Sequence, residues 1–259
     1  MKITFIGNGE AFDENVSNIS FVVESNSRIL FDCGYSVPQN FWKLYPDKDY
    51  LDAVFVSHFH ADHVAGLPML IMRMRQEKRS RFLKIIGPEG FRNSFKALYE
   101  LLYKGFWEIT GFDLIFVEMK GGDQFELGDL KFTFANASHL DGTPYFVPTL
   151  AARIDSGKSS ICYSSDTIYS ERIIELAKDC NLLIHDSYLP ESSDYHKKMN
   201  AHCSPKNAGI VARKSNASKL LLFNINRAFN DKKSEILNEA KSEFEKEIII
   251  PISGQSFEI

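Results

Sequence analysis

Apolar and polar positions alternate along the chain in a pattern that predicts two rounds of strands followed by helices. Short runs rich in β-branched or aromatic residues, bounded by glycine, asparagine or serine, predict strands. These runs are residues 2–6, 19–24, 28–31, 53–56, 83–86, 113–118, 130–135, 149–154, 160–163, 182–185, 219–223 and 248–250. The run 53–56 is apolar throughout, which is typical of a strand covered on both faces.

Apolar residues at helical spacing predict helices between these strands. One begins near Val64, and the others span about 89–103, 170–178, 204–216 and 231–246. Ser204 and Pro205 suit the N-cap and first residue of a helix. No linker rich in proline or serine divides the chain, so we expect one domain over residues 1–259. We predict an α/β (α+β) fold in which two β-sheets pack together with helices outside both.

Composition excludes several classes of protein. The 259 residues are 44% hydrophobic and 25% charged, as in soluble globular proteins. No apolar run approaches ~18 residues and the start leaves no room for a signal peptide, so we expect no membrane span. The scattered cysteines Cys33, Cys162, Cys180 and Cys203 form no CxxC pair, which favours a reduced, cytoplasmic chain.

The charge of the chain says less about its binding partners. The net charge of −4 provides no general attraction for nucleic acid. Residues 73–84 contain six basic and one acidic side chain, and we interpret them as a solvated helix end and loop. Lys197 and Lys198 could contact a phosphate, although a solvated loop is the simpler interpretation.

The residues that indicate chemistry lie directly after the strand at 53–56. His58, His60, Asp62 and His63 occur within six positions, at a junction between a strand and a helix. In an extended segment, residues two apart point the same way, so His58 and His60 can bind one ion together. The helix that follows turns Asp62 and His63 toward a neighbouring position. Imidazole and carboxylate ligands without a thiolate favour Zn²⁺, one or two ions, with Mn²⁺ or Fe²⁺ as alternatives.

This HxHxDH motif resembles the metallo-β-lactamase superfamily, and the resemblance covers nearly the whole chain. Other similar segments are the Gly7-Asn8-Gly9 turn, residues 30–34 (LFDCG), His139 after a strand, and residues 163–167 (YSSDT). The resemblance implies a four-layer αββα sandwich. It also implies that His139 is the third imidazole of the first metal site and that Asp166 bridges two metals, so the expected ligands are His58, His60, Asp62, His63, His139 and Asp166.

Within the superfamily, the sequence is most similar to the ribonuclease Z and phosphodiesterase branch. Residues 181–186 (NLLIHD) resemble a strand of that branch, and Ala201-His202-Cys203-Ser204 resembles the segment that supplies a catalytic histidine. Asp186 could fix the tautomer of His202 or be a buried structural carboxylate. The chain departs from the branch at Asn224, where a histidine usually binds the second metal. The second site is therefore expected to be looser, to take a harder ion or to be absent.

The resemblance implies a metal-dependent hydrolase, most simply a phosphodiesterase, in which a metal-activated hydroxide attacks phosphorus. Asp62 would orient or deprotonate the nucleophile, and His202 would bind the phosphoryl group and protonate the leaving oxygen. The substrate would be a phosphodiester, either a small molecule or RNA, and the sequence permits a homodimer. Three alternatives remain at this stage: a tRNA 3′-end endonuclease, a hydrolase of carbon esters, lactones or thioesters, and a non-catalytic metal-binding protein with a degenerate second site.

Overall fold

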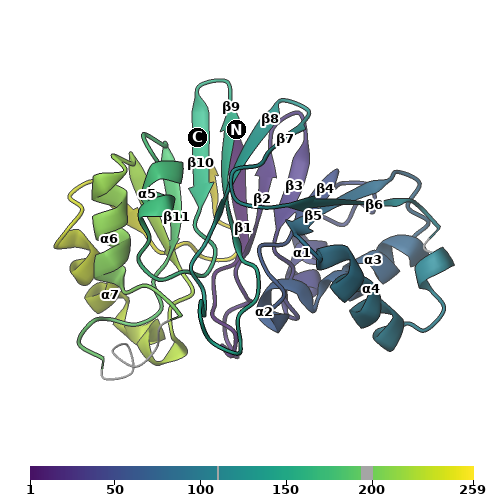
Figure 1. Cartoon of the computed structure of the whole chain (residues 1–259), viewed down its shortest axis with the longest axis horizontal. Coiled ribbons are helices and arrows are strands. Elements are labelled where there is room, and N and C mark those ends of the chain that lie inside the picture. Colours follow the sequence, from purple (N-terminus) through teal and green to yellow (C-terminus); the bar gives the residue numbers. More distant parts are fainter. Residues whose placement is uncertain (110, 194–200) are drawn as a thin grey trace.

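The structure is a computed structural model that describes residues 1–109, 111–193 and 201–259. Its strands form two seven-stranded sheets. Figure 1 shows the sheets face to face at the centre, with helices on the outer side of each. The chain therefore has the four-layer αββα arrangement, which confirms the predicted fold class.

The first sheet contains the N-terminal strands and the last strand. Its order is β14 (Ser256–Glu258), β1 (Lys2–Gly7), β2 (Ser20–Glu24), β3 (Arg28–Phe31), β4 (Ala53–Phe55), β5 (Leu83–Pro88) and β6 (Leu114–Met119). Strands β3 to β6 run parallel, whereas β14, β1, β2 and β3 pair antiparallel. Because β14 pairs with β1, the two termini lie side by side.

The second sheet mirrors this organisation. Its order is β13 (Glu247–Ile249), β12 (Lys219–Phe223), β11 (Leu182–Asp186), β10 (Ser159–Tyr163), β9 (Leu150–Ser156), β8 (Leu130–Asn136) and β7 (Gln124–Leu127). Strands β10 to β13 run parallel. The carboxyl ends of these strands consequently meet at one edge of the sheet, where loops can bring distant residues together.

Helices cover the outer face of each sheet. Helices α1 (Val37–Leu44), α2 (Ala61–Val64), α3 (Leu67–Gln76) and α4 (Phe91–Leu102) follow strands of the first sheet. Helices α5 (Glu171–Leu176), α6 (Pro205–Lys214) and α7 (Lys233–Lys241) follow strands of the second. Two 3₁₀ helices, η1 (Trp107–Ile109) and η3 (Arg227–Lys232), complete the named elements. Ser204 caps α6 as predicted, since its hydroxyl accepts from the Asn207 amide at 3.0 Å.

The strand β4 shows how the sequence pattern creates these layers. Ala53 and Phe55 belong to the core between the two sheets. Val54 and Val56 belong to a second core under the helices. Successive side chains of a strand point to opposite faces, so an uninterrupted apolar run serves both cores. The prediction that 53–56 is covered on both faces is therefore confirmed.

The sequence pattern did not predict four elements and misplaced two boundaries. Helix α1, the 3₁₀ helix η1 and the short strands β7 and β14 were missed. The helix expected from Val64 is two helices, α2 and α3, because the chain turns at Gly66, where a Cβ atom would lie 2.1 Å from the Gly34 carbonyl oxygen. The helix expected over 231–246 is η3 followed by α7. The single-domain organisation stays a prediction.

The interpretation of residues 73–84 as a solvated helix end and loop is wrong for one of its six basic residues. Arg79 is 2% exposed. Its guanidinium donates to the carbonyl oxygens of Lys48, Leu51, Arg81 and Phe82 at 2.7–2.8 Å. A planar guanidinium with five donors can satisfy four carbonyls at once, so this arginine fixes the loop before β4 rather than facing solvent.

Two further expectations concern the whole chain. All four cysteines are free and buried. Among the residues that the structure describes, no helix is long and apolar enough to cross a membrane.

Candidate metal centre and active site

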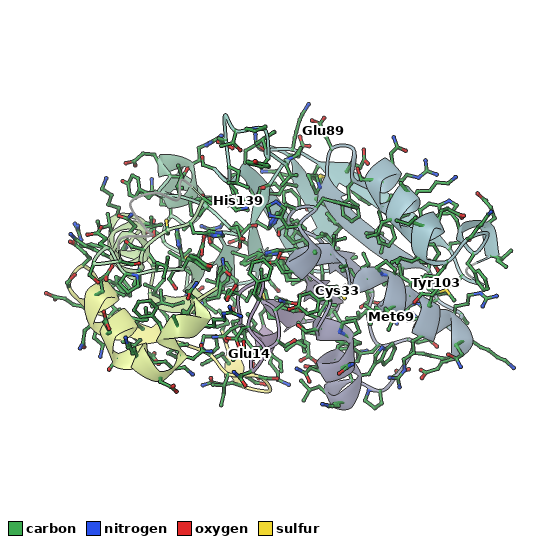
Figure 2. The ribbon with its side chains drawn as sticks, turned by 90° about the horizontal axis from the view of Figure 1, so that it is seen from below. Glu14, Cys33, Met69, Glu89, Tyr103 and His139 are labelled. Atoms are coloured by element: carbon green, nitrogen blue, oxygen red, sulfur yellow. The ribbon has the colours of Figure 1, made fainter. Side chains whose placement is uncertain are left out.

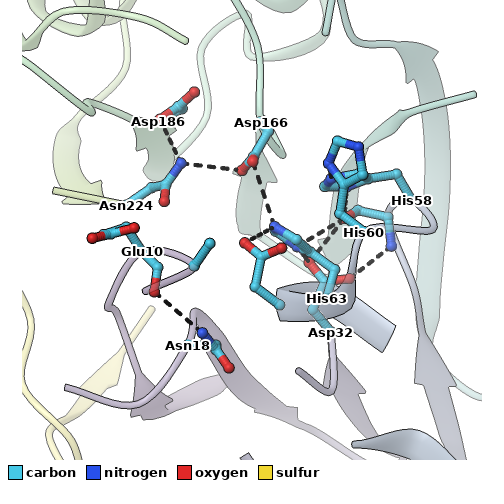
Figure 3. Close-up of polar contacts among 12 residues, drawn as sticks. Glu10, Asn18, Asp32, His58, His60, His63, Asp166, Asp186 and Asn224 are labelled. Atoms are coloured by element: carbon cyan, nitrogen blue, oxygen red, sulfur yellow. Dashed lines mark hydrogen bonds and ion pairs between the residues drawn. The ribbon is translucent and has the colours of Figure 1, made fainter. Parts of the chain in front are cut away.

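The predicted site residues meet where strands of both sheets end (Figure 3). His58 and His60 follow β4, and α2 carries Asp62 and His63. From the second sheet, His139 follows β8, Asp166 follows β10, Asp186 ends β11, Asn224 follows β12 and His202 precedes α6. Figure 2, a view from below, places His139 near the middle of the molecule, between its two halves. One site is thus assembled from both sheets.

Unusual backbone conformations surround the site. Asp32 and Asn224 directly follow β3 and β12 with φ of 53° and 60°. Ser165, beside Asp166, has φ of 54°. Residues other than glycine rarely adopt this left-handed conformation, and it concentrates at functional sites. Here it turns the chain sharply at the end of a strand.

Three imidazoles form the first group that could hold a metal ion, namely His58, His60 and His139. His60 Nδ1 lies 3.0 Å from His58 Nε2 and 3.2 Å from His139 Nε2. Two nitrogens bound to one tetrahedral Zn²⁺ at about 2.0–2.1 Å would lie about 3.3–3.4 Å apart, so the observed spacing fits a common ion. Burial lowers the pKa of His58 and of His60, and the neighbouring imidazoles lower both further. Both side chains are therefore neutral, as metal ligands must be.

The second group consists of His58, His63 and Asp166. The buried Nε2 atom of His63 makes no hydrogen bond. It faces Asp62 Oδ2 at 3.2 Å and Asp166 Oδ2 at 3.5 Å. Burial alone would lower the pKa of His63, but the carboxylates of Asp62, Asp166 and Asp32 raise it well above its ordinary value. These carboxylates demand a positive charge, which a proton on His63 or a bound cation can supply.

Asp32 fixes the orientation of His63. Its carboxylate accepts hydrogen bonds from the Ser57 amide at 2.7 Å, the Ser57 hydroxyl at 2.9 Å and the Tyr163 hydroxyl at 2.8 Å. His63 Nδ1 donates to the same carboxylate at 2.9 Å. The hydrogen therefore sits on Nδ1, and Nε2 is directed at Asp62 and Asp166. A carboxylate behind a metal-binding histidine is a common device for orienting the ring and raising its basicity.

His202 is held next to Asp166 by a contact with Asp186. Its Nδ1 atom lies 2.8 Å from Asp186 Oδ2 and 3.8 Å from Asp166 Oδ2. Burial lowers the pKa of His202, but Asp186 and then Asp166 and Asp62 raise it to about 9. Asp186 is fully buried and also contacts His202. It is therefore both the buried carboxylate and the partner of His202 that the sequence offered as alternatives.

Asn224 joins this network through its amide group. Its Nδ2 atom is 3.2 Å from Asp186 Oδ1 and 3.5 Å from Asp166 Oδ1. Because both neighbours are acceptors, the amide turns its NH₂ group toward them. In this orientation Asn224 is a donor that links the Asp166 and Asp186 carboxylates.

A pocket of about 540 Å³ opens over these groups. His60, Asp62, His139, Asp166, His202 and Asn224 form its floor and walls, together with Glu10, Ala11, Phe12, Tyr35, Ala61, Leu140, Tyr188 and Ala201. The sequence interpretation missed Glu10, Phe12, Tyr35 and Tyr188. The position of Glu10 directly after the Gly7-Asn8-Gly9 turn could have indicated that it belongs to the site. Nothing in the sequence indicates this for the aromatic residues Phe12, Tyr35 and Tyr188.

Lys197 and Lys198, which could contact a phosphate, lie outside the described residues, as does His196. His185 is buried, with Nδ1 donating to the Asp186 carbonyl at 2.8 Å, and it belongs to none of the ligand groups found in the described part of the chain.

Comparison with known proteins places the chain in a family. A sequence model described as "Anti-Pycsar protein Apyc1" matches residues 1–205. The chain belongs to this family. Every residue of the groups that could hold a metal ion lies within the matched segment.

This Apyc1-family chain is also similar to ribonuclease Z of Haloarcula marismortui. The two are 26% identical over 298 residues, covering 98% of this chain and 95% of the other. The metallo-β-lactamase fold protein YhfI of Bacillus subtilis is 26% identical, with a TM-score of 0.83 and coverage of 99% and 98%. Human tRNase Z, short form, is 18% identical with a TM-score of 0.80, covering 100% of this chain and 99% of the other, and shares the fold. The predicted relation to the metallo-β-lactamase superfamily and to ribonuclease Z is confirmed.

The role of Asp32 leads to a prediction about metal affinity. Replacing Asp32 by Asn keeps the size of the side chain but removes the charge behind His63. We expect Zn²⁺ to bind roughly 10–100-fold more weakly at the weaker site, measured by competition with a chromophoric chelator. Asp113→Ala, which removes an exposed carboxylate from another part of the same sheet, serves as the control. Equal affinity in Asp32→Asn and the parent protein would show that Asp32 does not support metal binding.

Proposed function

We propose that this chain is a metal-dependent phosphodiesterase that hydrolyses small nucleotide-like phosphodiesters, with cyclic nucleotides as the first substrates to test. The observation that carries the proposal is the position of Asp166. It lies between a histidine-rich group on one side and the His202–Asp186 pair on the other. Residues that could bind a metal ion and a histidine that could protonate the leaving oxygen of a phosphate ester thus line one pocket.

The residues present fit one or two divalent ions. His58, His60, His139 and Asp166 would hold the first ion, and Asp62, His63 and Asp166 the second. A bound Zn²⁺ or Mn²⁺ ion would polarise a phosphoryl oxygen and lower the pKa of water. Asp62 is 13% exposed at its side chain and lines the pocket, so its carboxylate can orient an attacking water and accept its proton.

His202 supplies the proton for the leaving oxygen. With Nδ1 donating to Asp186, its other nitrogen, Nε2, bonds to no described residue and remains available to the pocket. A histidine whose pKa is about 9 keeps its proton at neutral pH. It can therefore bind a phosphoryl oxygen as a cation and protonate an alkoxide as it departs.

Pocket chemistry supports a small substrate over tRNA. Among the described residues that line the pocket there is no lysine or arginine. Binding to a nucleic acid backbone normally depends on several such cations. A volume of about 540 Å³ is within the range of about 300–1,000 Å³ that small ligands occupy. A tRNA 3′-end endonuclease stays the second candidate, because the relatives named ribonuclease Z match the chain over nearly its full length.

Asn224 is the residue that favours the alternative of a non-catalytic metal-binding protein. An asparagine in place of a ligand weakens the second site, but here the side chain is engaged by Asp166 and Asp186 rather than left unpaired. The arrangement supports an active enzyme with one strong and one weak metal site more than a decayed one.

A substrate panel tests the proposed function. The protein, loaded with Zn²⁺ or Mn²⁺, is expected to hydrolyse bis-p-nitrophenyl phosphate and at least one 3′,5′-cyclic nucleotide, and to lose this activity on treatment with a chelator. Asp62→Ala should reduce the rates of both reactions by roughly 10²-fold or more, because it removes the carboxylate that accepts a proton from the attacking water. Cleavage of pre-tRNA without turnover of any small diester would favour the second candidate. No turnover of any substrate would favour a binding protein.

The role of His202 can be separated from simple substrate binding by the leaving group. A sugar alkoxide requires protonation as it leaves, whereas p-nitrophenolate is stable without it. We therefore expect His202→Ala to reduce kcat by roughly 10²–10⁴-fold for a cyclic nucleotide and much less for bis-p-nitrophenyl phosphate. Equal losses on both substrates would remove His202 from the role of general acid.

A further inference from the structure

The loop between β1 and β2, residues 8–19, forms one wall of the pocket, and we call it the entry loop. It contributes Glu10, Ala11 and Phe12 to the pocket. Its path requires glycine at Gly7 and Gly9, where a Cβ atom would lie 2.3 Å from the Ser17 oxygen and 2.6 Å from the Val16 oxygen. The loop is thus folded tightly back on itself beside the metal-binding groups.

The entry loop is fixed from both halves of the molecule. The buried Asn18 side chain donates to the Glu10 carbonyl at 3.2 Å. Gly9 bridges to Ile225, directly after Asn224. Arg227 Nη1 donates to the Phe12 carbonyl at 3.1 Å. These contacts hold Glu10 in place before any substrate arrives, which limits the entropy that ordering would otherwise cost on binding.

Glu10 is a buried carboxylate with an unfilled hydrogen-bonding position. It is 2% exposed, and its Oε2 atom accepts from the Phe12 amide at 2.9 Å. Among the described residues, no group donates to Oε1. Because Glu10 lines the pocket, its Oε1 atom can accept a hydrogen bond from a ligand group that takes the place of water there.

The surroundings of Glu10 restrict what that ligand group can be. Figure 3 shows its carboxylate on the Asn224 side of the site, away from His58 and His60. It belongs to none of the metal-ligand groups in the described part of the chain. Asp62 and Asp166 line the same pocket, so a second negative group such as a phosphate is disfavoured beside it. A neutral hydroxyl or amino group is the suitable partner.

Aromatic side chains lie at the mouth of the same pocket. Phe12 is 72% exposed and Tyr35 is 52% exposed, although both line the pocket. The Tyr35 hydroxyl donates to the Ala11 carbonyl at 2.9 Å, which attaches this ring to the entry loop. Exposed aromatic rings beside an anion-binding site are suitable surfaces for stacking a nucleobase.

We propose that Glu10 recognises the nucleoside part of the substrate by accepting a hydrogen bond from its sugar hydroxyl or from an amino group of its base, while Phe12 and Tyr35 pack against the base. This inference rests on the proposed phosphodiesterase function and adds a specificity determinant to it. Glu10 lies apart from the histidines and is not assigned a part in the chemical step.

The experiment crosses variants of the protein with variants of the substrate. The substrates are the best cyclic nucleotide of the panel, its 2′-deoxy analogue, its analogue without the amino group of the base, and bis-p-nitrophenyl phosphate. Glu10→Ala is expected to lower kcat/KM for the parent nucleotide about 10–100-fold, the loss typical of one hydrogen bond to a charged group. It should leave bis-p-nitrophenyl phosphate, which has neither donor, unchanged. Asn15→Ala, a change at an exposed position of the same loop, is the matched control.

Comparison of the two analogues shows whether Glu10 accepts its hydrogen bond from the sugar hydroxyl or from the amino group of the base. The analogue that lacks the group bound by Glu10 is the informative one. In the parent protein this analogue should react about as slowly as the complete nucleotide does in Glu10→Ala, and in Glu10→Ala the two should react equally. Glu10→Gln, which keeps an acceptor without the charge, should recover part of the activity. This variant shows that the effect is not a loss of folding.

Two results would overturn the inference. The first is an equal loss on the nucleotide and on bis-p-nitrophenyl phosphate, which would place Glu10 in the metal centre. The second is a Glu10→Ala effect of the same size on every nucleotide analogue, or no effect on any of them. Absence of turnover by the parent protein on all the diesters would instead contradict the proposed function on which the inference rests.

Discussion

Buried negative charge at the junction of the two sheets is the constraint on which the rest of the site depends. The carboxylates of Asp32, Asp166 and Asp186 are at most 2% exposed, and Asp62 lies beside them. Such groups are costly to bury unless positive charge compensates them. His202 supplies that charge as a protonated imidazole, and beside His63 either a proton or a bound cation supplies it. His58 and His60 are neutral and can bind a cation. The arrangement is therefore suited to divalent metal.

The fold delivers these groups because parallel strands end at a common edge. His58, Asp166, Asp186 and Asn224 stand at or just after strand ends, whereas His202 stands just before α6. Asp32 and Asn224, whose φ angles are positive, turn the chain at the ends of β3 and β12. The entry loop adds a second requirement. Because Gly7 and Gly9 let it fold back without a clash, a rigid wall carrying Glu10 faces the metal-binding groups. The metal-binding groups and Glu10, the proposed recognition residue, thus lie on separate walls of one pocket.

The sequence predicted the layered fold and the histidine ligand groups because local signals encode them. The apolar run at 53–56 has the pattern of a strand covered on both faces, and three histidines within six positions have few structural explanations. Tertiary contacts are not encoded locally in this way. Nothing in the sequence near Arg79 shows that its guanidinium donates to two carbonyls of a distant loop, those of Lys48 and Leu51. Likewise, the partners of Asn224 come from β11 and from the loop after β10, and Glu10 meets them only after the sheets have packed.

We expect the histidines that follow the strands of both sheets to form one metal centre around Asp166. The decisive measurement is an X-ray crystal structure of the metal-loaded protein, with anomalous data collected at the absorption edge of the added metal. We expect a strong anomalous peak between His58, His60 and His139, and a weaker one beside His63 and Asp62. Stoichiometric metal bound elsewhere, with these histidines retaining their present mutual contacts, would contradict it.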